Sequence, residues 1–288
     1  MHASTVRSLL VRGMLAGLIA GLFAFAVAYV VGEPPVNGAI AVEEARSAQA
    51  PHAGHDGTTV AESGKSVGSG ESSAAGHAHE GQAEQEEAAV SRPVQSTLGL
   101  ATGVLVYGVA LGGIAALAFS FALGRIGRFS PRAAAALTAG AAFTTVYLVP
   151  FLKYPATPPA VGNPDTIGKR TTLFFLMILL SVLLGVAAVI AGRRLAPRLG
   201  NWNASLAAGA GFVVVTAVAF AVLPPNDDAV QASFPAALLW EFRLASLAIQ
   251  LVLWAVFGVV FGILAQKTLT ERTAAAAPPA PLTAPLAD

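Results

Sequence analysis

Six long apolar segments dominate the sequence, and none of them contains an acidic residue. A helix that spans a membrane needs about 20 mostly apolar residues, and each segment is close to that length. Because the segments lack the strict alternation of barrel strands, the sequence predicts an all-α integral membrane protein with about six transmembrane helices. The segments are Leu9–Val31, Leu98–Leu123, Ala133–Leu152, Thr171–Ala191, Ser205–Leu223 and Leu244–Ala265.

Small residues recur at a spacing of four within the first two segments. Gly13, Gly17 and Gly21 follow this spacing in the first segment, as do Gly108 and Gly112 in the second. Small side chains on one face of a membrane helix let a second helix approach closely. We therefore expect these glycines to lie at contacts between helices.

Composition argues against several classes of function. Only 11% of the residues are charged and 55% are hydrophobic, whereas a soluble domain carries about 25% charged residues. The chain has no cysteine, which excludes disulfides, thiolate metal sites and cysteine nucleophiles. The stretch GNPDTIGKRT does not match a nucleotide-binding loop, because five residues separate Gly162 from Gly168 and Arg170 follows Lys169. We expect neither enzymatic activity nor a nucleic-acid partner.

Charges next to the apolar segments predict the orientation in the membrane. Lys and Arg concentrate in cytoplasmic loops, and the stretches GRIGRFSPR and GRRLAPRLGN both face the cytoplasm if the N-terminus does. Most Asp and Glu residues then face outward. The outer loop from Lys153 to Arg170 is an exception, since it carries Lys169 as well as these two basic residues. We expect both termini to be cytoplasmic.

With this orientation, we expect the chain to consist of five regions on or across the membrane. Residues 1–8 form a cytoplasmic N-terminus, and residues 9–31 form a first helix whose apolar run exceeds the usual 7–15 residues of a cleaved signal peptide. Residues 32–97 form a periplasmic loop rich in His and Glu, and residues 98–265 form the remaining helical bundle. Residues 266–288 form a disordered cytoplasmic tail rich in Ala and Pro.

The loop after the first helix contains most of the histidines. From about Ala41 to Arg92 it is polar, acidic and rich in Gly and Ser, so it cannot bury enough apolar surface to fold and is expected to be disordered. Imidazole and carboxylate ligands suit Co(II), Ni(II), Zn(II) and Cu(II) better than Mg(II) or Ca(II). The loop is either a metal-capture segment or a linker that happens to contain histidine. The candidate ligands are His52, His55, His77, His79 and Glu80.

Three proline-rich phrases mark the outer ends of predicted helices: GEPPVNGA, TPPAVGNPD and LPPNDDA. A Pro pair cannot continue a helix, so each pair predicts an abrupt helix end. Asp165 belongs to the second phrase, and Asp227 and Asp228 belong to the third. The phrases are either three separate helix ends or three converging loops that offer oxygen ligands to a divalent cation.

Four stretches of the chain carry a family pattern: VRGMLAGLIAG, GEPPVNGAIAVEEA, GLATGVLVYGVALGG and VPFLKYPATPPAVGNPDTIGKRT. They resemble the CbtA family, which comprises predicted cobalt transporter subunits of bacteria. The resemblance implies a multi-pass protein of the bacterial inner membrane that is linked to cobalamin metabolism. It also implies a small single-helix membrane partner of the CbtB type.

The leading hypothesis is a membrane subunit of a cobalt or nickel uptake system. In this hypothesis the His/Glu loop captures the divalent ion, and the proline-rich outer loops lead it to a path between helices. Two alternatives stay open. In the first, the protein is a membrane scaffold or metal sensor that transports nothing. In the second, it carries another solute and the histidines are incidental.

Overall fold

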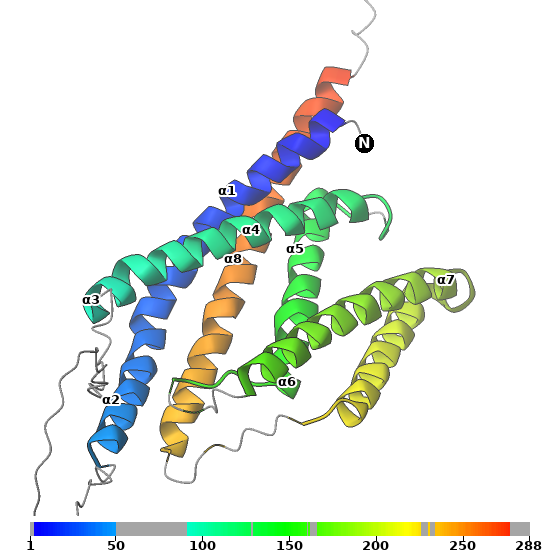
Figure 1. Cartoon of the computed structure of the whole chain (residues 1–288). Helices are drawn as coiled ribbons and strands as arrows, with labels where there is room; N and C mark the ends of the chain where they lie inside the picture. The colour runs from blue at the N-terminus through cyan, green and yellow to red at the C-terminus, as the bar shows by residue number, and fades with distance from the viewer. Residues whose placement is uncertain are drawn as a thin grey trace, which may run out of the picture.

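Helices make up all of the regular structure in the described part of the chain. The computed structural model describes residues 3–49, 91–127, 129–159, 161, 166–225, 230 and 234–276. Within these ranges five helices are long and apolar enough to cross a membrane, and Figure 1 shows how they lie relative to one another. The predicted all-α membrane class is therefore confirmed.

Each of the first three long helices contains a π-helical stretch. The first consists of α1 (Ala3–Val27), η1 (Ala28–Gly32) and α2 (Glu33–Gln49). The second consists of α3 (Arg92–Val94), η2 (Gln95–Gly99) and α4 (Leu100–Ala122). The third consists of α5 (Pro131–Ala142), η3 (Phe143–Leu148) and α6 (Val149–Lys153). The last two long helices are α7 (Ile167–Val222) and α8 (Ala236–Ala276). Residues 266–276 are therefore helical, and the predicted disorder of the tail is wrong for them.

The first helix continues through its proline pair, so the predicted helix end there is wrong. Pro34 and Pro35 lie in the first turn of α2, directly after η1. A proline removes one backbone donor and crowds the preceding turn. The wider π turn absorbs this defect, and the N–H of Glu33 donates to the carbonyl of Ala28, five residues earlier. The other two pairs do follow helix ends, since α6 ends at Lys153 and α7 ends at Val222.

Helix α2 also extends into the segment that was expected to be disordered. The prediction placed disorder from about Ala41, but residues 41–49 are helical. The stretch AVEEARSAQ is rich in Ala, Glu, Arg and Gln, which are strong helix formers. The whole first helix has 47 residues, or roughly 70 Å. It is much longer than the hydrocarbon core of about 30 Å, so α2 projects beyond any bilayer that α1 spans.

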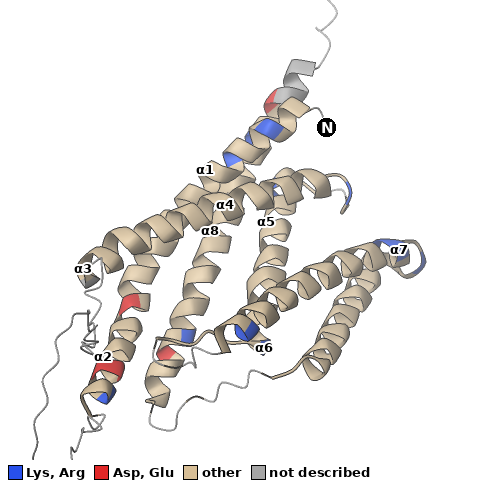
Figure 2. Cartoon of the chain, in the orientation of Figure 1, with Lys and Arg blue, Asp and Glu red and all other residues tan. Residues whose placement is uncertain are grey.

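Charged residues cluster at the ends of the helices. Figure 2 shows basic residues near the N-terminus of α1 and at the turn within α7, whereas the acidic residues of α2 lie toward the opposite end of the first helix. The basic residues at the first of these ends include Arg7 and Arg12, and the acidic residues of α2 are Glu33, Glu43 and Glu44. The long apolar middle sections separate the two groups.

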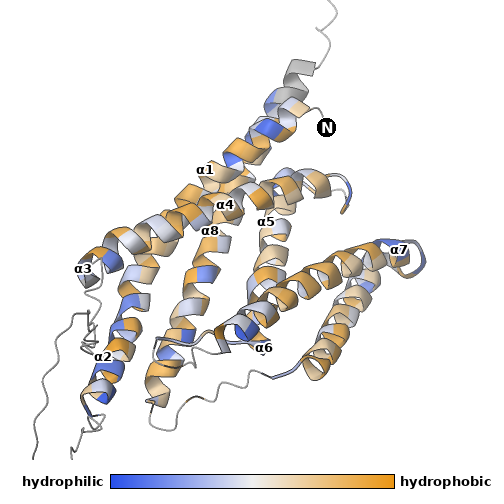
Figure 3. Ribbon diagram, viewed as in Figure 1, coloured by the Kyte–Doolittle hydropathy of each residue, from blue (hydrophilic) through white to orange (hydrophobic). Residues whose placement is uncertain are grey.

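Helix α7 reverses direction at one glycine. Gly200 has φ 77° and ψ 159°, which is not helical, and the chain turns back there (Figure 1). Glycine has no Cβ, so a positive φ carries no steric penalty. Each arm contains one predicted apolar segment, Thr171–Ala191 or Ser205–Leu223. Apolar residues cover both arms, and the turn is hydrophilic (Figure 3).

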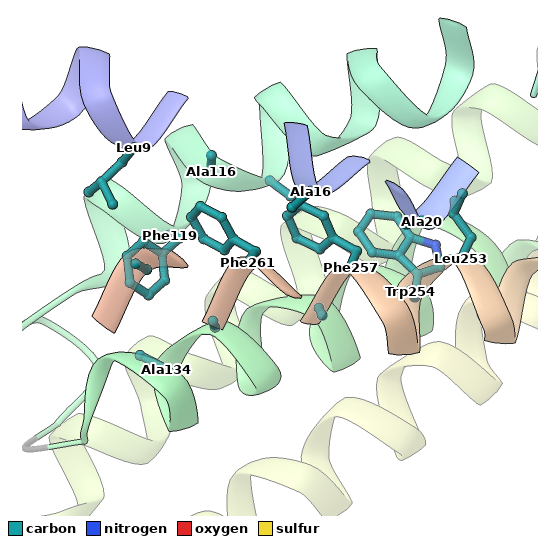
Figure 4. Close-up of a cluster of buried hydrophobic side chains, with 14 of the residues drawn as sticks. Leu9, Ala16, Ala20, Ala116, Phe119, Ala134, Leu253, Trp254, Phe257 and Phe261 are labelled. Carbon is teal, nitrogen blue, oxygen red and sulfur yellow. The ribbon is translucent and has the colours of Figure 1, made fainter. Parts of the chain in front are cut away.

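The core lies where α1, α4, α5 and α8 meet, and small residues bring the helix backbones together. A Cβ on Gly17 would lie 2.1 Å from the carbonyl oxygen of Gly108, and one on Gly112 would lie 2.4 Å from that of Gly13. The predicted glycine contacts are therefore confirmed. The larger side chains drawn in Figure 4 fill the space beside them, and they include Leu9, Phe119, Leu253, Trp254, Phe257 and Phe261.

Candidate functional site

Residues of the first two proline-rich phrases pack together with a residue that follows the third phrase. Ala39 of α2, Val161 after α6 and Phe234 before α8 form one buried apolar cluster. Ala39 ends the first phrase, Val161 lies within the second, and Phe234 follows the third. The side chains packed around them are Val42, Val230, Leu238 and Leu239. We call these seven residues the outer cluster.

Hydrogen bonds tie the last residue of α6 and the residue after it to the end of α7. The Nζ atom of Lys153 donates to the carbonyl oxygens of Phe220 at 2.6 Å and Leu223 at 3.0 Å. The last carbonyls of a helix lack intrahelical donors and attract a cation. The hydroxyl of Tyr154 donates to the carbonyl of Pro224 at 2.9 Å, and burial raises the pKa of this phenol, so it stays a donor.

The start of α8 is joined to the same segment. The Nε atom of Arg243 donates to the carbonyl oxygen of Ala156 at 3.4 Å. Arg46 of α2 lies over the ring of Phe234, 5.9 Å from its centroid. This geometry fits a cation–π contact, which fastens α2 to the segment before α8.

The predicted metal ligands all lie outside the described residues. They are His52, His55, His77, His79, Glu80, Asp165, Asp227 and Asp228. Among the residues that the structure does describe, no group of three or more His, Cys, Asp or Glu residues could hold a metal ion. Val161 precedes Asp165 by four residues and Phe234 follows Asp228 by six, and both belong to the outer cluster.

A pocket of about 190 Å³ opens beside the outer cluster. It lies between η1, the beginnings of α2 and α4, and α8. Glu33 is the one charged residue among those that line it. The lining residues are Ala28, Gly32, Glu33, Val36, Leu100, Phe242, Ala245, Ser246 and Ile249.

Sequence reasoning missed this pocket and a polar contact further along α8. The Nε2 atom of Gln250 donates to the hydroxyl of Tyr107 on α4 at 3.5 Å. A single Gln and a single Tyr in two separate apolar segments form no recognisable pattern. The signal that was available is the position of Glu33, an acidic residue directly after an apolar helix and directly before a Pro pair.

Long apolar helices that pack through glycines, with polar groups gathered at their ends, define a multi-pass membrane protein. The family model described as probable cobalt transporter subunit, CbtA, matches residues 6–266. The match covers nearly the whole chain, so this chain belongs to the CbtA family and the predicted resemblance is confirmed. No curated protein and no solved structure matches the chain.

Proposed function

We propose that this protein is the membrane subunit of a system that imports Co(II), or Ni(II), across the bacterial inner membrane for cobalamin metabolism. The family match over residues 6–266 carries this proposal, because the family consists of probable cobalt transporter subunits. A transporter subunit is not an enzyme class, and we assign no reaction to the chain. The driving force is the partner or the membrane potential, which favours inward movement of a cation.

We propose six crossings, with both termini in the cytoplasm. The two arms of α7 are each long and apolar enough to count as one crossing, which adds one to the five long helices. Basic residues at the N-terminal end of α1 and at the turn of α7 support this orientation under the positive-inside rule (Figure 2). The acidic α2 then faces the periplasm.

The capture step uses the loop between α2 and α3. His52 follows three residues after Gln49, where α2 ends. In the proposal, the four histidines and Glu80 bind the ion weakly and release it rapidly. In the proposal the ion then passes to Asp165, Asp227 and Asp228, and the packing of Val161 and Phe234 against α2 supports this order, because these two residues flank the aspartates in the sequence. Affinity order favours Cu(II) over Co(II) at such ligands, so the preference for cobalt comes from geometry or metal supply.

The word subunit implies a partner, and we propose a small single-helix membrane protein of the CbtB type. Membrane lipid covers the apolar flanks that no partner covers. Both arms of α7 carry exposed large apolar side chains, among them Phe175, Leu179, Val213 and Val218. These side chains need an apolar surrounding, and lipid or a partner helix supplies it.

Metal accumulation in a transport-deficient host tests the proposal. The chain is expressed with and without its partner, as wild type and with His52, His55, His77 and His79 changed to Ala. We expect cobalt, measured by elemental analysis, to accumulate with the wild type and to fall with the histidine variant at low external metal. If folded protein in the membrane accumulates no metal in any form, the transport proposal is wrong.

A further inference from the structure

Polar groups on one stripe of α8 continue inward from the pocket at Glu33. Ser246 lines that pocket, and Gln250 and Trp254 follow at intervals of four residues. Residues four apart share a helix face, so the three side chains form a line about 12 Å long. Between Leu244 and Ala265 these three are the only residues of α8 with a polar side-chain atom.

Two atoms of this line are buried without a hydrogen-bond partner in the protein. They are the Oε1 atom of Gln250 and the Nε1 atom of Trp254. The amide of Gln250 donates only through Nε2, to the hydroxyl of Tyr107. An unpaired buried polar group costs free energy. An unpaired acceptor and an unpaired donor one turn apart suit water, which supplies both hydrogen-bonding roles.

The line ends inward at a packed aromatic cluster. The rings of Phe257 and Phe261 stack with centroids 5.2 Å apart, and Phe119 of α4 meets Phe261 edge-on at 5.0 Å. Figure 4 shows Trp254, Phe257 and Phe261 following one another along α8. The side chains of Phe119 and Phe261 are fully buried. Between Leu244 and Ala265, polar side-chain atoms therefore lie only in the part of α8 from the pocket to Trp254.

We propose that the pocket at Glu33 is the mouth of a water-filled path for a hydrated divalent cation. The path runs along Ser246, Gln250 and Tyr107, between α4 and α8, and closes at Phe257. This inference deepens the proposed function, since it gives the ion a route between helices, and only the identity of the ion rests on that function. The structure then corresponds to a state open to the outer side.

The side chains that line the path determine which property of an ion the path can discriminate. The path is lined by oxygen atoms, which contact a hydrated cation through its water shell. They are the carboxylate of Glu33, the hydroxyl of Ser246, the amide of Gln250 and the phenol of Tyr107. Oxygen ligands do not favour Co(II) over Mg(II), whereas imidazole does. Selection of the metal therefore belongs to the capture loop, and the path selects for charge.

Single-cysteine variants test the path, because the natural chain has no cysteine. Thiols react as thiolates, so a water-soluble cationic methanethiosulfonate reagent modifies only positions that water reaches. We expect Ser246→Cys and Gln250→Cys to react from the outer side of intact cells. Leu251→Cys is the matched control, since Leu251 is the next residue of α8 but points away from the core, with 55% of its surface exposed. We expect no reaction at this control.

The charge of Glu33 is tested in the Gln250→Cys background. The negative charge of Glu33 attracts a cationic reagent and repels an anionic one. Glu33→Gln should therefore lower the ratio of the cationic to the anionic reaction rate by roughly five-fold. Glu43→Gln is the control, because Glu43 is exposed on the same helix and lines no part of the pocket. Added Co(II) should slow modification of the variant that retains Glu33.

The outcomes separate this inference from the transport proposal. Failure of Gln250→Cys to react, with the thiol reactive after denaturation, means that there is no water path. Equal reaction of Leu251→Cys means the same, because water access is then not confined to the stripe. If cells accumulate cobalt but either of these two labelling results is found, the proposed function stands and the water path is wrong. The expected labelling without cobalt accumulation keeps a cation path and overturns the cobalt assignment.

Discussion

Arg12 near the start of the first helix donates a hydrogen bond from Nη1 to the backbone carbonyl of Leu264 in the last helix, at 3.0 Å. The same guanidinium contacts the hydroxyl of Thr268, and its Nη2 atom lies 3.9 Å from a carboxylate oxygen of Glu271. The contacts join α1 and α8 at the end opposite the outer cluster. The two helices are thus held together on the far side of the aromatic cluster of Phe119, Phe257 and Phe261.

We predict that Arg12→Leu destabilises the protein. A hydrogen bond to a charged group contributes roughly 1.5–3 kcal/mol, and the side chain of Arg12 is only 27% exposed. Thermal unfolding in detergent micelles measures the loss. Arg7→Leu removes the same charge from an exposed position of the same helix and should change stability little. Equal stability of the two variants would show that the contacts of Arg12 contribute nothing.

The glycine contact between α1 and α4 gives the second prediction. Gly17→Ala should destabilise the protein, because the new Cβ would lie 2.1 Å from the carbonyl oxygen of Gly108 and the two backbones must separate. Overpacking of this kind costs about 1–3 kcal/mol. Gly103→Ala on α4 is the control, since no atom lies within 4 Å of its new Cβ. A neutral effect at Gly17 would mean that α1 shifts freely along α4.

The third prediction concerns the attachment of the end of α6 to the end of α7. Lys153→Met keeps the length of the side chain but leaves the carbonyls of Phe220 and Leu223 without this donor. We expect faster hydrogen exchange at the C-terminal end of α7, measured by mass spectrometry. Lys267→Met, at an exposed lysine of α8, should leave that exchange unchanged. Unchanged exchange in Lys153→Met would contradict a capping role.

Tyr154 predicts how stability changes at alkaline pH. Burial raises its pKa above the ordinary value of 10.0, so the folded protein holds the proton more tightly than the unfolded chain does. The contribution of Tyr154 is therefore complete below about pH 10 and is lost as pH rises above that value. Tyr154→Phe should flatten this part of the curve of melting temperature against pH. A curve that keeps the slope of the wild type would show that other groups cause it.

Much of the fold could be predicted from the sequence, because membrane helices follow from apolar length alone. All six apolar segments lie almost wholly within helices, and the spacing of Gly13 and Gly17 correctly predicted a close contact. The end of the first helix could not be predicted from Pro34 and Pro35. A π-helical turn tolerates the missing donors, and no local pattern in the sequence announces one.

The candidate site was less accessible to sequence reasoning. The phrases around Pro158 and Pro224 suggested converging loops; Val161 of the second phrase packs against Ala39 of the first, whereas the third phrase is represented in the outer cluster only by residues that follow it. The pocket at Glu33 and the contact between Gln250 and Tyr107 depend on which helices lie side by side. Isolated polar residues in apolar segments carry no such information. The roles of the histidines and aspartates stay predictions.

The last prediction separates capture from passage. Changing Asp165, Asp227 and Asp228 together to Asn should lower the rate of cobalt accumulation at every external concentration. In the proposed route every ion passes these carboxylates, so we expect their loss to reduce the rate by roughly ten-fold, equivalent to about 1.4 kcal/mol. The variant without His52, His55, His77 and His79 should lose uptake only at low external cobalt, because capture is not limiting when the ion is abundant.

Elemental analysis of cells at several cobalt concentrations measures both effects. The control changes the exposed Glu43 and Glu44 of α2 to Gln, which removes outer negative charge without touching the aspartates. If this control loses as much uptake as the aspartate variant, then general attraction of cations explains the effect and the aspartates are not ligands. If the histidine variant fails at every concentration, the capture loop is an obligatory part of the route rather than a collector that feeds it.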